Sequence, residues 1–254
     1  MAILETKNLI KRFDSVKAVN DLSLAFQEGL ITSLIGPNGS GKTTLINALS
    51  GMLALDGGFV ILSESVKLYK IRPYEIFTYG ITRTFQEVRL FNQMTVLDNI
   101  LVVLTERNVF GALFSAFGGS ASGGEKYKSY HLDKAADILK PLGLWEKRDE
   151  LAINLSFGQR KLLEIARALA MEAEIYLLDE PFAGLFPEMR KIVSGIISNL
   201  KQKGKTVILI EHSMDLIRQL SDYVFVMNEG KLLAEGKPAE VLAKKEVIEA
   251  YLGE

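Results

Sequence analysis

The fold is decided at residues 36–43, which read Gly36-Pro37-Asn38-Gly39-Ser40-Gly41-Lys42-Thr43. This stretch matches the pattern G-x-x-x-x-G-K-[ST] and stands between an apolar run at 30–35 (LITSLI) and a helical pattern at 45–49. Glycines let a backbone wrap closely around phosphate oxygens, and the positive end of a following helix dipole adds to the attraction. The stretch therefore predicts a phosphate-binding loop on a strand–loop–helix unit, rather than a glycine-rich turn that merely opens a helix.

The residue types at the end of this loop predict separate roles. Lys42 is expected to bridge the β- and γ-phosphates of a nucleotide, and the Thr43 hydroxyl is expected to ligate Mg²⁺. Thr44 closes the glycine-rich turn predicted over residues 36–44 and is placed with the nucleotide-binding residues.

A second set of polar residues follows a later apolar run. Residues 175–178 are apolar, and Asp179 and Glu180 come directly after them. Ligands of open α/β sheets bind at the carboxyl ends of strands, so both carboxylates are expected beside the phosphate loop. Asp179 is then predicted to hold Mg²⁺ through a water, and Glu180 to polarise the water that attacks the γ-phosphate. The alternative is a strand that ends in two solvated acids.

Two further side chains are candidates for the same site. His212 follows a predicted strand at 206–210 and is expected to donate a hydrogen bond to the γ-phosphate. Gln86 is expected to offer its amide oxygen to Mg²⁺ or to the attacking water. His131, the other of the two histidines, is read as a structural residue.

Strand-like and helical patterns alternate along the chain, which indicates an α/β fold. We expect a phosphate-loop nucleotide-binding core (1–87 and 158–254) with an antiparallel β edge and an inserted α-helical subdomain near 88–157, all in one domain. The edge strands are predicted at 2–6, 22–26 and 57–62, and a hairpin at 223–234. Helical patterns cover 94–140, with a loop-like interruption at 118–124, and 156–170.

Composition narrows the class of protein. The 254 residues include no cysteine, which excludes disulfide frameworks, thiolate zinc sites and cysteine nucleophiles. Lys+Arg 30 against Asp+Glu 31 leaves a net charge of −1, so nucleic acid is not an expected partner. Charged residues fill the start of the chain, and no run approaches the roughly 20 apolar residues of a membrane span. A soluble, cytoplasmic chain is expected.

A third motif identifies a family. Leu155-Ser156-Phe157-Gly158-Gln159 opens an amphipathic helix shortly before the Asp179-Glu180 strand. With the phosphate loop, Gln86, Glu180 and His212 in this order, the chain resembles an ABC-type ATPase, the nucleotide-binding subunit of ABC transporters. The resemblance extends over essentially the whole chain.

The resemblance implies ATP and Mg²⁺ as ligands and a shared catalytic site. Ser156, Gly158 and Gln159 would contact the γ-phosphate of ATP held by a second ATPase protomer. ATP would close a head-to-tail dimer, and hydrolysis would open it. Phe13 matches the position that stacks on adenine, with a core aromatic of the edge sheet as the alternative.

Two positions depart from the family pattern. Phe157 stands where the signature often has Gly, and Phe186 stands in the D-loop where Asn or Asp is more common. If that D-loop side chain normally bonds across the dimer, Phe186 removes a polar contact.

The segments 83–91 and 94–99 and the ending 250–254 look like the branched-chain amino acid importer branch. This implies membrane permease subunits, a related second ATPase and an extracytoplasmic substrate-binding protein as partners, with the ATPase at the cytoplasmic face of the membrane. The ATPase of a lipid-exporting ABC complex is the nearest alternative, followed by a soluble, non-transport ABC ATPase. The aromatic run at 109–117 is read as packed or mobile rather than as an exposed patch for a permease or bilayer.

Overall fold

The strand–loop–helix unit predicted around the phosphate loop is present in the computed structural model. Strand β4 (Ile31–Ile35) is buried at all five positions, and helix α1 (Lys42–Leu49) follows the loop. The helix begins at Lys42 rather than after the predicted turn at 36–44. The reason is Gly41, whose φ of 101° lets the chain turn directly into the helix.

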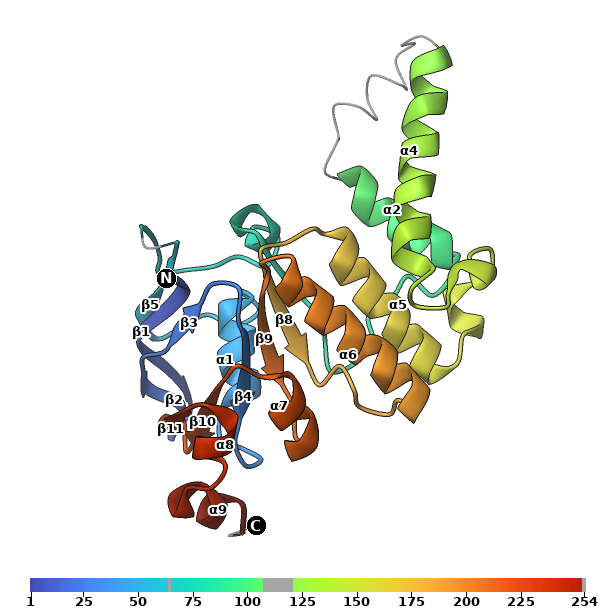
Figure 1. The fold of residues 1–254 in the computed structure, drawn as a ribbon. Coiled ribbons are helices and arrows are strands. Elements are labelled where there is room, and N and C mark those ends of the chain that lie inside the picture. Colours follow the sequence, from blue (N-terminus) through green and yellow to red (C-terminus); the bar gives the residue numbers. More distant parts are fainter. Residues whose placement is uncertain (64, 107–120, 253–254) are drawn as a thin grey trace. The chain divides into compact units, whose positions relative to one another are not determined.

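The structure describes residues 1–63, 65–106 and 121–252 (Figure 1). The aromatic run at 109–117 lies outside the described residues. In chain order the strands are β1 (Ala2–Phe13), β2 (Val16–Leu22), β3 (Ala25–Gln27), β4, β5 (Gly57–Leu62), β6 (Val66–Leu68), β7 (Ile81–Arg83), β8 (Ile175–Asp179), β9 (Thr206–Ile210), β10 (Tyr223–Asn228) and β11 (Lys231–Gly236). The α-helices are α1, α2 (Val96–Glu106), α4 (Ala121–Leu139), α5 (Phe157–Ala170), α6 (Pro187–Gln202), α7 (Met214–Leu220), α8 (Pro238–Val241) and α9 (Lys245–Leu252). Short 3₁₀ turns lie at Ile76–Tyr79, Trp145–Lys147 and Ala152–Asn154.

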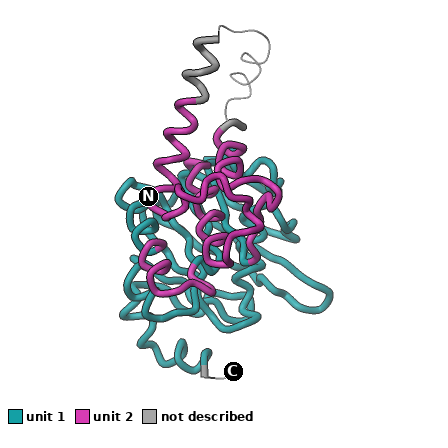
Figure 2. The backbone as a smooth tube through the Cα atoms, turned by 90° about the vertical axis from the view of Figure 1, so that its right-hand side faces the viewer, with its two compact units in different colours: residues 1–86, 173–181, 194–254 teal, residues 87–172, 182–193 magenta. Residues whose placement is uncertain are grey.

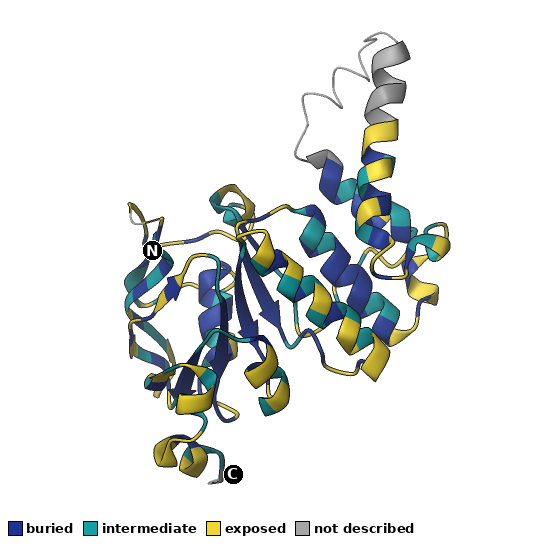
Figure 3. Ribbon diagram, in the orientation of Figure 1, coloured by how far each residue is buried: buried dark blue, intermediate teal, exposed yellow. Residues whose placement is uncertain are grey.

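Six strands form the nucleotide-fold sheet, in the order β11-β10-β4-β9-β8-β7. All neighbours except the β10–β11 pair are parallel, and that antiparallel pair is the predicted hairpin. Strands β4, β8 and β9 are buried along their whole length (Figure 3), as expected of parallel strands covered on both faces. Their carboxyl ends therefore meet at one edge of the sheet.

The predicted antiparallel edge is a separate sheet, in which β1 pairs with β2, β3 and β5, and β5 pairs with β6. The strand predicted at 2–6 extends to Phe13. The strand predicted at 22–26 was wrong, because β2 ends at Leu22 and β3 begins only at Ala25. Between these two strands the Leu24 N–H donates to the side-chain oxygen Thr6 Oγ1 at 2.8 Å instead of to a neighbouring strand. A pattern of apolar residues does not predict such a contact.

One hydrophobic core holds the two sheets and α1 together. It contains Leu45, Ile46 and Leu49 of α1 along with buried side chains of both sheets. Phe26 of β3 and Phe225 of β10 meet edge to face within it, with ring centroids 5.2 Å apart. A second core covers the other face of the six-stranded sheet with apolar residues of α7, α8 and α9. The phosphate-loop helix is thus held against the sheets by its apolar face.

The chain divides into two compact units, which Figure 2 colours separately. The first comprises residues 1–86, 173–181 and 194–254, and the second comprises 87–172 and 182–193. The helical unit therefore includes all of α5 and the loop after Pro181, and reaches further than the expected 88–157.

In the helical unit, α2, α4 and α5 pack against one another, with buried apolar residues such as Ile100, Leu139 and Leu163 between them. The interruption predicted at 118–124 is wrong for residues 121–124, which form the first turn of α4. Packing of the later turns outweighs the weak helix propensity of Gly123 and Gly124. Within the described residues, no helix combines the length and apolar character needed to cross a bilayer.

Candidate nucleotide site

The phosphate loop requires glycine at two positions for reasons visible in the backbone. Gly36 has a φ of 148° and Gly41 a φ of 101°, both in the region that side chains disfavour. A Cβ atom at Gly36 would overlap the carbonyl oxygen of Met227, and one at Gly41 would overlap that of Ala18. The loop therefore packs closely against the backbone at Met227 and at Ala18, and this packing restricts the direction of its N–H groups.

Lys42 folds back over this loop. Its buried ammonium donates to the carbonyl oxygens of Gly36 at 2.7 Å and Pro37 at 2.8 Å, and to Ser40 Oγ at 3.2 Å. Asn38 and Gly39 are exposed at the tip. The positive group is thus held inside the loop, where an incoming phosphate would meet it.

The first turn of α1 favours an anion. It carries no acidic residue, and no side chain caps its N-terminus. Thr43 is exposed and Thr44 half-buried in this turn. The N–H groups at the start of the helix and the helix dipole add to the positive potential around Lys42.

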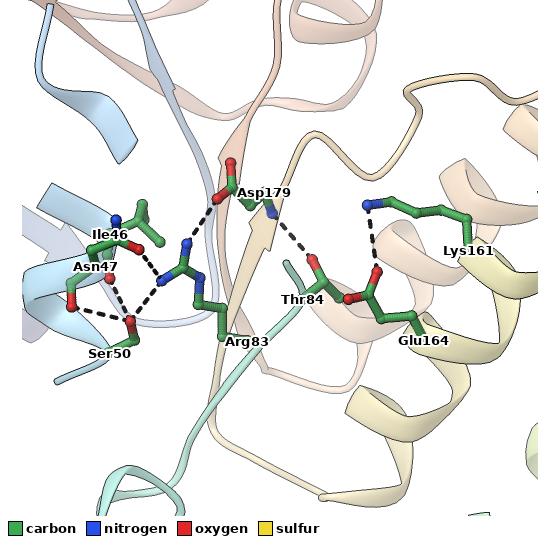
Figure 4. A network of polar contacts seen from close by, with 8 residues as sticks. All are labelled: Ile46, Asn47, Ser50, Arg83, Thr84, Lys161, Glu164 and Asp179. Carbon is green, nitrogen blue, oxygen red and sulfur yellow. Dashed lines mark hydrogen bonds and ion pairs between the residues drawn. The ribbon is translucent and has the colours of Figure 1, made fainter. Parts of the chain in front are cut away.

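Asp179 ends β8, and its side chain is only 2% exposed. Arg83, which ends β7, donates from Nη2 to Asp179 Oδ2 at 2.9 Å (Figure 4). The Asp179 N–H donates to Thr84 Oγ1 at 3.1 Å. Arg83 therefore holds the carboxylate that is predicted to bind metal, and Thr84 holds the backbone of the same residue.

Glu180 and His212 come together at the carboxyl ends of β8 and β9. His212 Nε2 lies 3.1 Å from Glu180 Oε1. Glu180 has a φ of 48°, a left-handed conformation that is uncommon for residues other than glycine. Its N–H donates to the Ile210 carbonyl oxygen at 3.1 Å, which holds this conformation. Strain of this kind concentrates at functional sites.

Glu211 was not selected from the sequence, yet it organises the turn that carries His212. Its Oε1 accepts hydrogen bonds from the N–H groups of His212 and Ser213, both at 3.1 Å. Burial raises the pKa of this carboxyl, and the two N–H groups oppose the rise. Oε2 is buried without a hydrogen-bond partner among the described residues. In the sequence, the only indication of this role was an acidic residue at the end of an apolar strand.

The residues present fit a Mg²⁺ ion. No group of three or more His, Cys, Asp or Glu side chains with metal-binding geometry occurs in the described part of the chain. Mg²⁺ does not need such a cluster, because it binds through one or two carboxylates, substrate phosphates and retained waters. Asp179 and the exposed hydroxyl of Thr43 are oxygen donors of the required kind.

Two predicted residues are exposed at the ends of elements. Gln86 lies beyond the end of β7 and is exposed. Phe13 ends β1 with 48% of its surface exposed, so it is not a core residue of the edge sheet, and its ring remains available for stacking. Its contact with adenine stays a prediction.

The signature residues open α5 in the helical unit. Ser156 is the N-cap: its Oγ accepts from the Gln159 N–H at 3.3 Å, and Gln159 Oε1 accepts from the Ser156 N–H at 3.0 Å. This reciprocal capping box fixes the helix start. A Cβ at Gly158 would lie 2.5 Å from Met189 Sδ, so glycine permits close packing there. Phe157 and Phe186 are 49% and 71% exposed.

Together the loop after β4 and the acids after β8 define a P-loop nucleotide-binding domain. A family model described as "ABC transporter" matches residues 19–183. A second model, described as "Branched-chain amino acid ATP-binding cassette transporter", matches residues 231–254. The chain therefore belongs to the ABC transporter family, and the resemblance stated from its motifs is confirmed.

Individual relatives match along their whole length. LivG of Salmonella typhimurium, a high-affinity branched-chain amino acid transport ATP-binding protein, is 42% identical over 99% of this chain and 98% of its own. BraF of Pseudomonas aeruginosa, named for the same role, is 38% identical with the same coverage of each chain. A nucleotide-free ATP-binding cassette from an ABC transporter superposes with a TM-score of 0.82 at 37% identity, and each chain is covered completely.

Proposed function

We propose that this chain is the ATP-hydrolysing subunit of an ABC importer for branched-chain or other hydrophobic amino acids. The observation that carries the proposal is the end-to-end similarity to relatives named for branched-chain amino acid transport. The match of residues 231–254 to a model of that same branch supports it, because this segment lies outside the general family match at 19–183.

Hydrolysis proceeds by direct attack of water on the γ-phosphate, without a phosphoenzyme. Lys42 and the loop N–H groups hold the phosphate charge, and Phe13 stacks on the adenine. Glu180 accepts the proton of the attacking water, and His212 steadies the γ-phosphate. The 3.1 Å contact between these two side chains supports this division of roles.

Thr43, Gln86 and Asp179 are the residues proposed to hold Mg²⁺. A bound ion would supply positive charge that offsets the charge of the phosphates. The chain's own contribution is to present these oxygen donors at the edge where β4 and β8 end. Arg83 and Thr84 restrict the motion of Asp179 there.

The complete site needs a second ATPase protomer, identical or related. Ser156, Gly158 and Gln159 of one protomer are proposed to contact the γ-phosphate bound by the other. ATP then closes the head-to-tail dimer, and hydrolysis opens it. The dimer acts on membrane permease subunits at the cytoplasmic face of the membrane, and an extracytoplasmic binding protein delivers the substrate.

Transport by the reconstituted complex tests the substrate class. The chain is co-reconstituted with its permease, partner ATPase and binding protein in vesicles, and uptake is measured for a panel of labelled amino acids. ATP-dependent uptake should be fastest for branched-chain and other hydrophobic members. Extraction of labelled lipid is the control, and ATP-dependent lipid extraction without amino acid uptake would refute the proposal.

A further inference from the structure

The guanidinium of Arg83 lies buried between the Asp179 carboxylate and the last turn of α1 (Figure 4). Nη2 donates to Asp179 Oδ2 at 2.9 Å. Nη1 donates to Asn47 Oδ1 at 2.7 Å and to Ser50 Oγ at 2.8 Å. The side chains of Arg83 and Asp179 are only 6% and 2% exposed. One side chain therefore joins the end of β8 to the helix that begins at the phosphate loop.

This geometry requires arginine. A guanidinium presents its donors in a planar, rigid fork and can serve acceptors on two sides at once. A lysine ammonium is a single point of charge on a flexible stem, so it cannot reproduce the bridge between Asp179 and α1. Ser50 is itself anchored, because its Oγ donates to the Ile46 carbonyl oxygen at 2.8 Å. The Ser50 acceptor is thus fixed to the end of the helix.

Arg83 also stands at the start of the segment that carries Gln86. The Arg83 guanidinium carbon lies 5.0 Å from the centre of the Phe85 ring, a cation–π distance. The Thr84 N–H donates to the Leu177 carbonyl oxygen at 3.0 Å, which continues the pairing of β7 with β8. Asp179 and the beginning of the Gln86 segment are therefore held by the same two consecutive residues.

We propose that Arg83 is a positioning residue for the metal site: it orients the Asp179 carboxylate and fixes its distance from the phosphate-loop helix by anchoring on Asn47 and Ser50. The inference rests on the metal role proposed above for Asp179. Partners that orient a metal-binding side chain without touching the metal change metal affinity by about 10–100-fold when they are lost. Arg83 is such a partner, and it acts through Asp179.

Mn²⁺ binding to the full-length chain tests the proposal without relying on turnover. Free Mn²⁺ is measured by electron paramagnetic resonance in the presence of saturating ADP. Arg83→Gln and Arg83→Lys should each raise the Kd for Mn²⁺ by about tenfold or more, while ADP affinity in EDTA stays as in the wild type. Asn47→Ala and Ser50→Ala retain the Arg83–Asp179 ion pair, but each removes one acceptor of the Arg83 guanidinium on α1. They should raise the Kd for Mn²⁺ by less than the Arg83 variants do.

The controls separate the possible failures. Arg218→Gln removes an exposed arginine and should leave Mn²⁺ binding unchanged. Asp179→Asn tests the metal role itself: unchanged Mn²⁺ binding in that variant refutes the proposed metal site. If Asp179→Asn weakens Mn²⁺ binding but folded Arg83→Gln binds it equally or more tightly, only the positioning role is refuted. Should Arg83→Gln fail to fold, Asn47→Ala and Ser50→Ala decide, because neither leaves a buried charge unpaired, and unchanged binding in both refutes the anchoring.

Discussion

His212 contacts Glu180 directly, Nε2 to Oε1 at 3.1 Å, although 32 residues separate them in the chain. The contact forms because β8 and β9 are parallel neighbours whose carboxyl ends coincide, with Asp179 paired to Ile210. The side chain proposed as general base thus has a histidine within hydrogen-bond distance. The backbone N–H of His212 donates in turn to Glu211 Oε1, which holds the turn that carries the imidazole.

Glu180→Gln should separate binding from hydrolysis. The amide keeps the size of the side chain but cannot accept the proton of the attacking water, so turnover should fall by at least about 10²-fold. ATP affinity should persist, and the closed dimer should accumulate on size-exclusion chromatography with ATP. Near-normal phosphate release would remove Glu180 from the role of general base.

Lys42→Ala should weaken nucleotide binding itself. A charge-assisted hydrogen bond contributes about 1.5–3 kcal/mol, which corresponds to roughly a 10–100-fold rise in Kd. Calorimetric titration with ATP measures the change. Lys203→Ala, at an exposed lysine, is the matched control. Equal affinities in the two variants would contradict the phosphate contact.

Phe13→Ala should weaken the binding of ATP and of GTP to a similar extent. Stacking contacts the face of the base, and the edges that distinguish adenine from guanine are not touched. Stacking on an aromatic side chain contributes about 1–3 kcal/mol per base. Val16 pairs with Phe13 across β1 and β2 and is 63% exposed, so Val16→Ala is the control for a general effect at this edge. Fluorescent-nucleotide titrations measure both. A loss confined to ATP would point to base-edge recognition instead.

Glu211→Gln should change how stability depends on pH. Burial raises the pKa of Glu211 above its ordinary value of 4.5. Below pH 4.5 the carboxyl is protonated in the folded and in the unfolded chain, and its contribution to stability is fully present. The contribution is lost as the pH rises through the folded-state pKa, because the unfolded chain releases its proton first. The variant lacks this loss, so its stability relative to the wild type should increase across that window.

Urea unfolding over a pH series measures this difference. Glu146→Gln, at an exposed acid, serves as the control and should run parallel to the wild type. If the Glu211→Gln curve also runs parallel, the carboxyl does not titrate differently in the folded chain.

The phosphate loop was predictable because the conformation of its own backbone requires glycine at fixed positions. Those glycines can be seen directly in the sequence. The meeting of Glu180 and His212 followed from a general rule about strand ends. Arg83 was not predictable as a partner of Asp179, because their contact depends on β7 lying beside β8, and no local pattern specifies that order. The break between β2 and β3 was missed for a similar reason: it depends on a hydrogen bond to Thr6, 18 residues away.

Gly184 and Phe157 form a steric pair that joins the signature motif to the loop before α6. Gly184 has a φ of 70°, and a Cβ atom built on it would lie 2.6 Å from Cε1 of Phe157. Gly184→Ala should therefore destabilise the helical unit through the left-handed backbone at about 1–3 kcal/mol. Displacing the Phe157 ring, which is 49% exposed, should add a smaller cost.

The two contributions can be separated with a second substitution. Phe157→Gly removes the ring, so Gly184→Ala in that background should cost only the backbone term. A double-mutant cycle by urea unfolding measures the difference, and hydrogen exchange at residues 182–186 reports whether the loop loosens when the ring is removed. Additive effects in the cycle would show that the added Cβ atom does not meet the ring. Faster exchange at 182–186 in Phe157→Gly alone would mean that the aromatic at the third signature position stiffens the D-loop, in the same segment where Phe186 replaces the more common Asn or Asp.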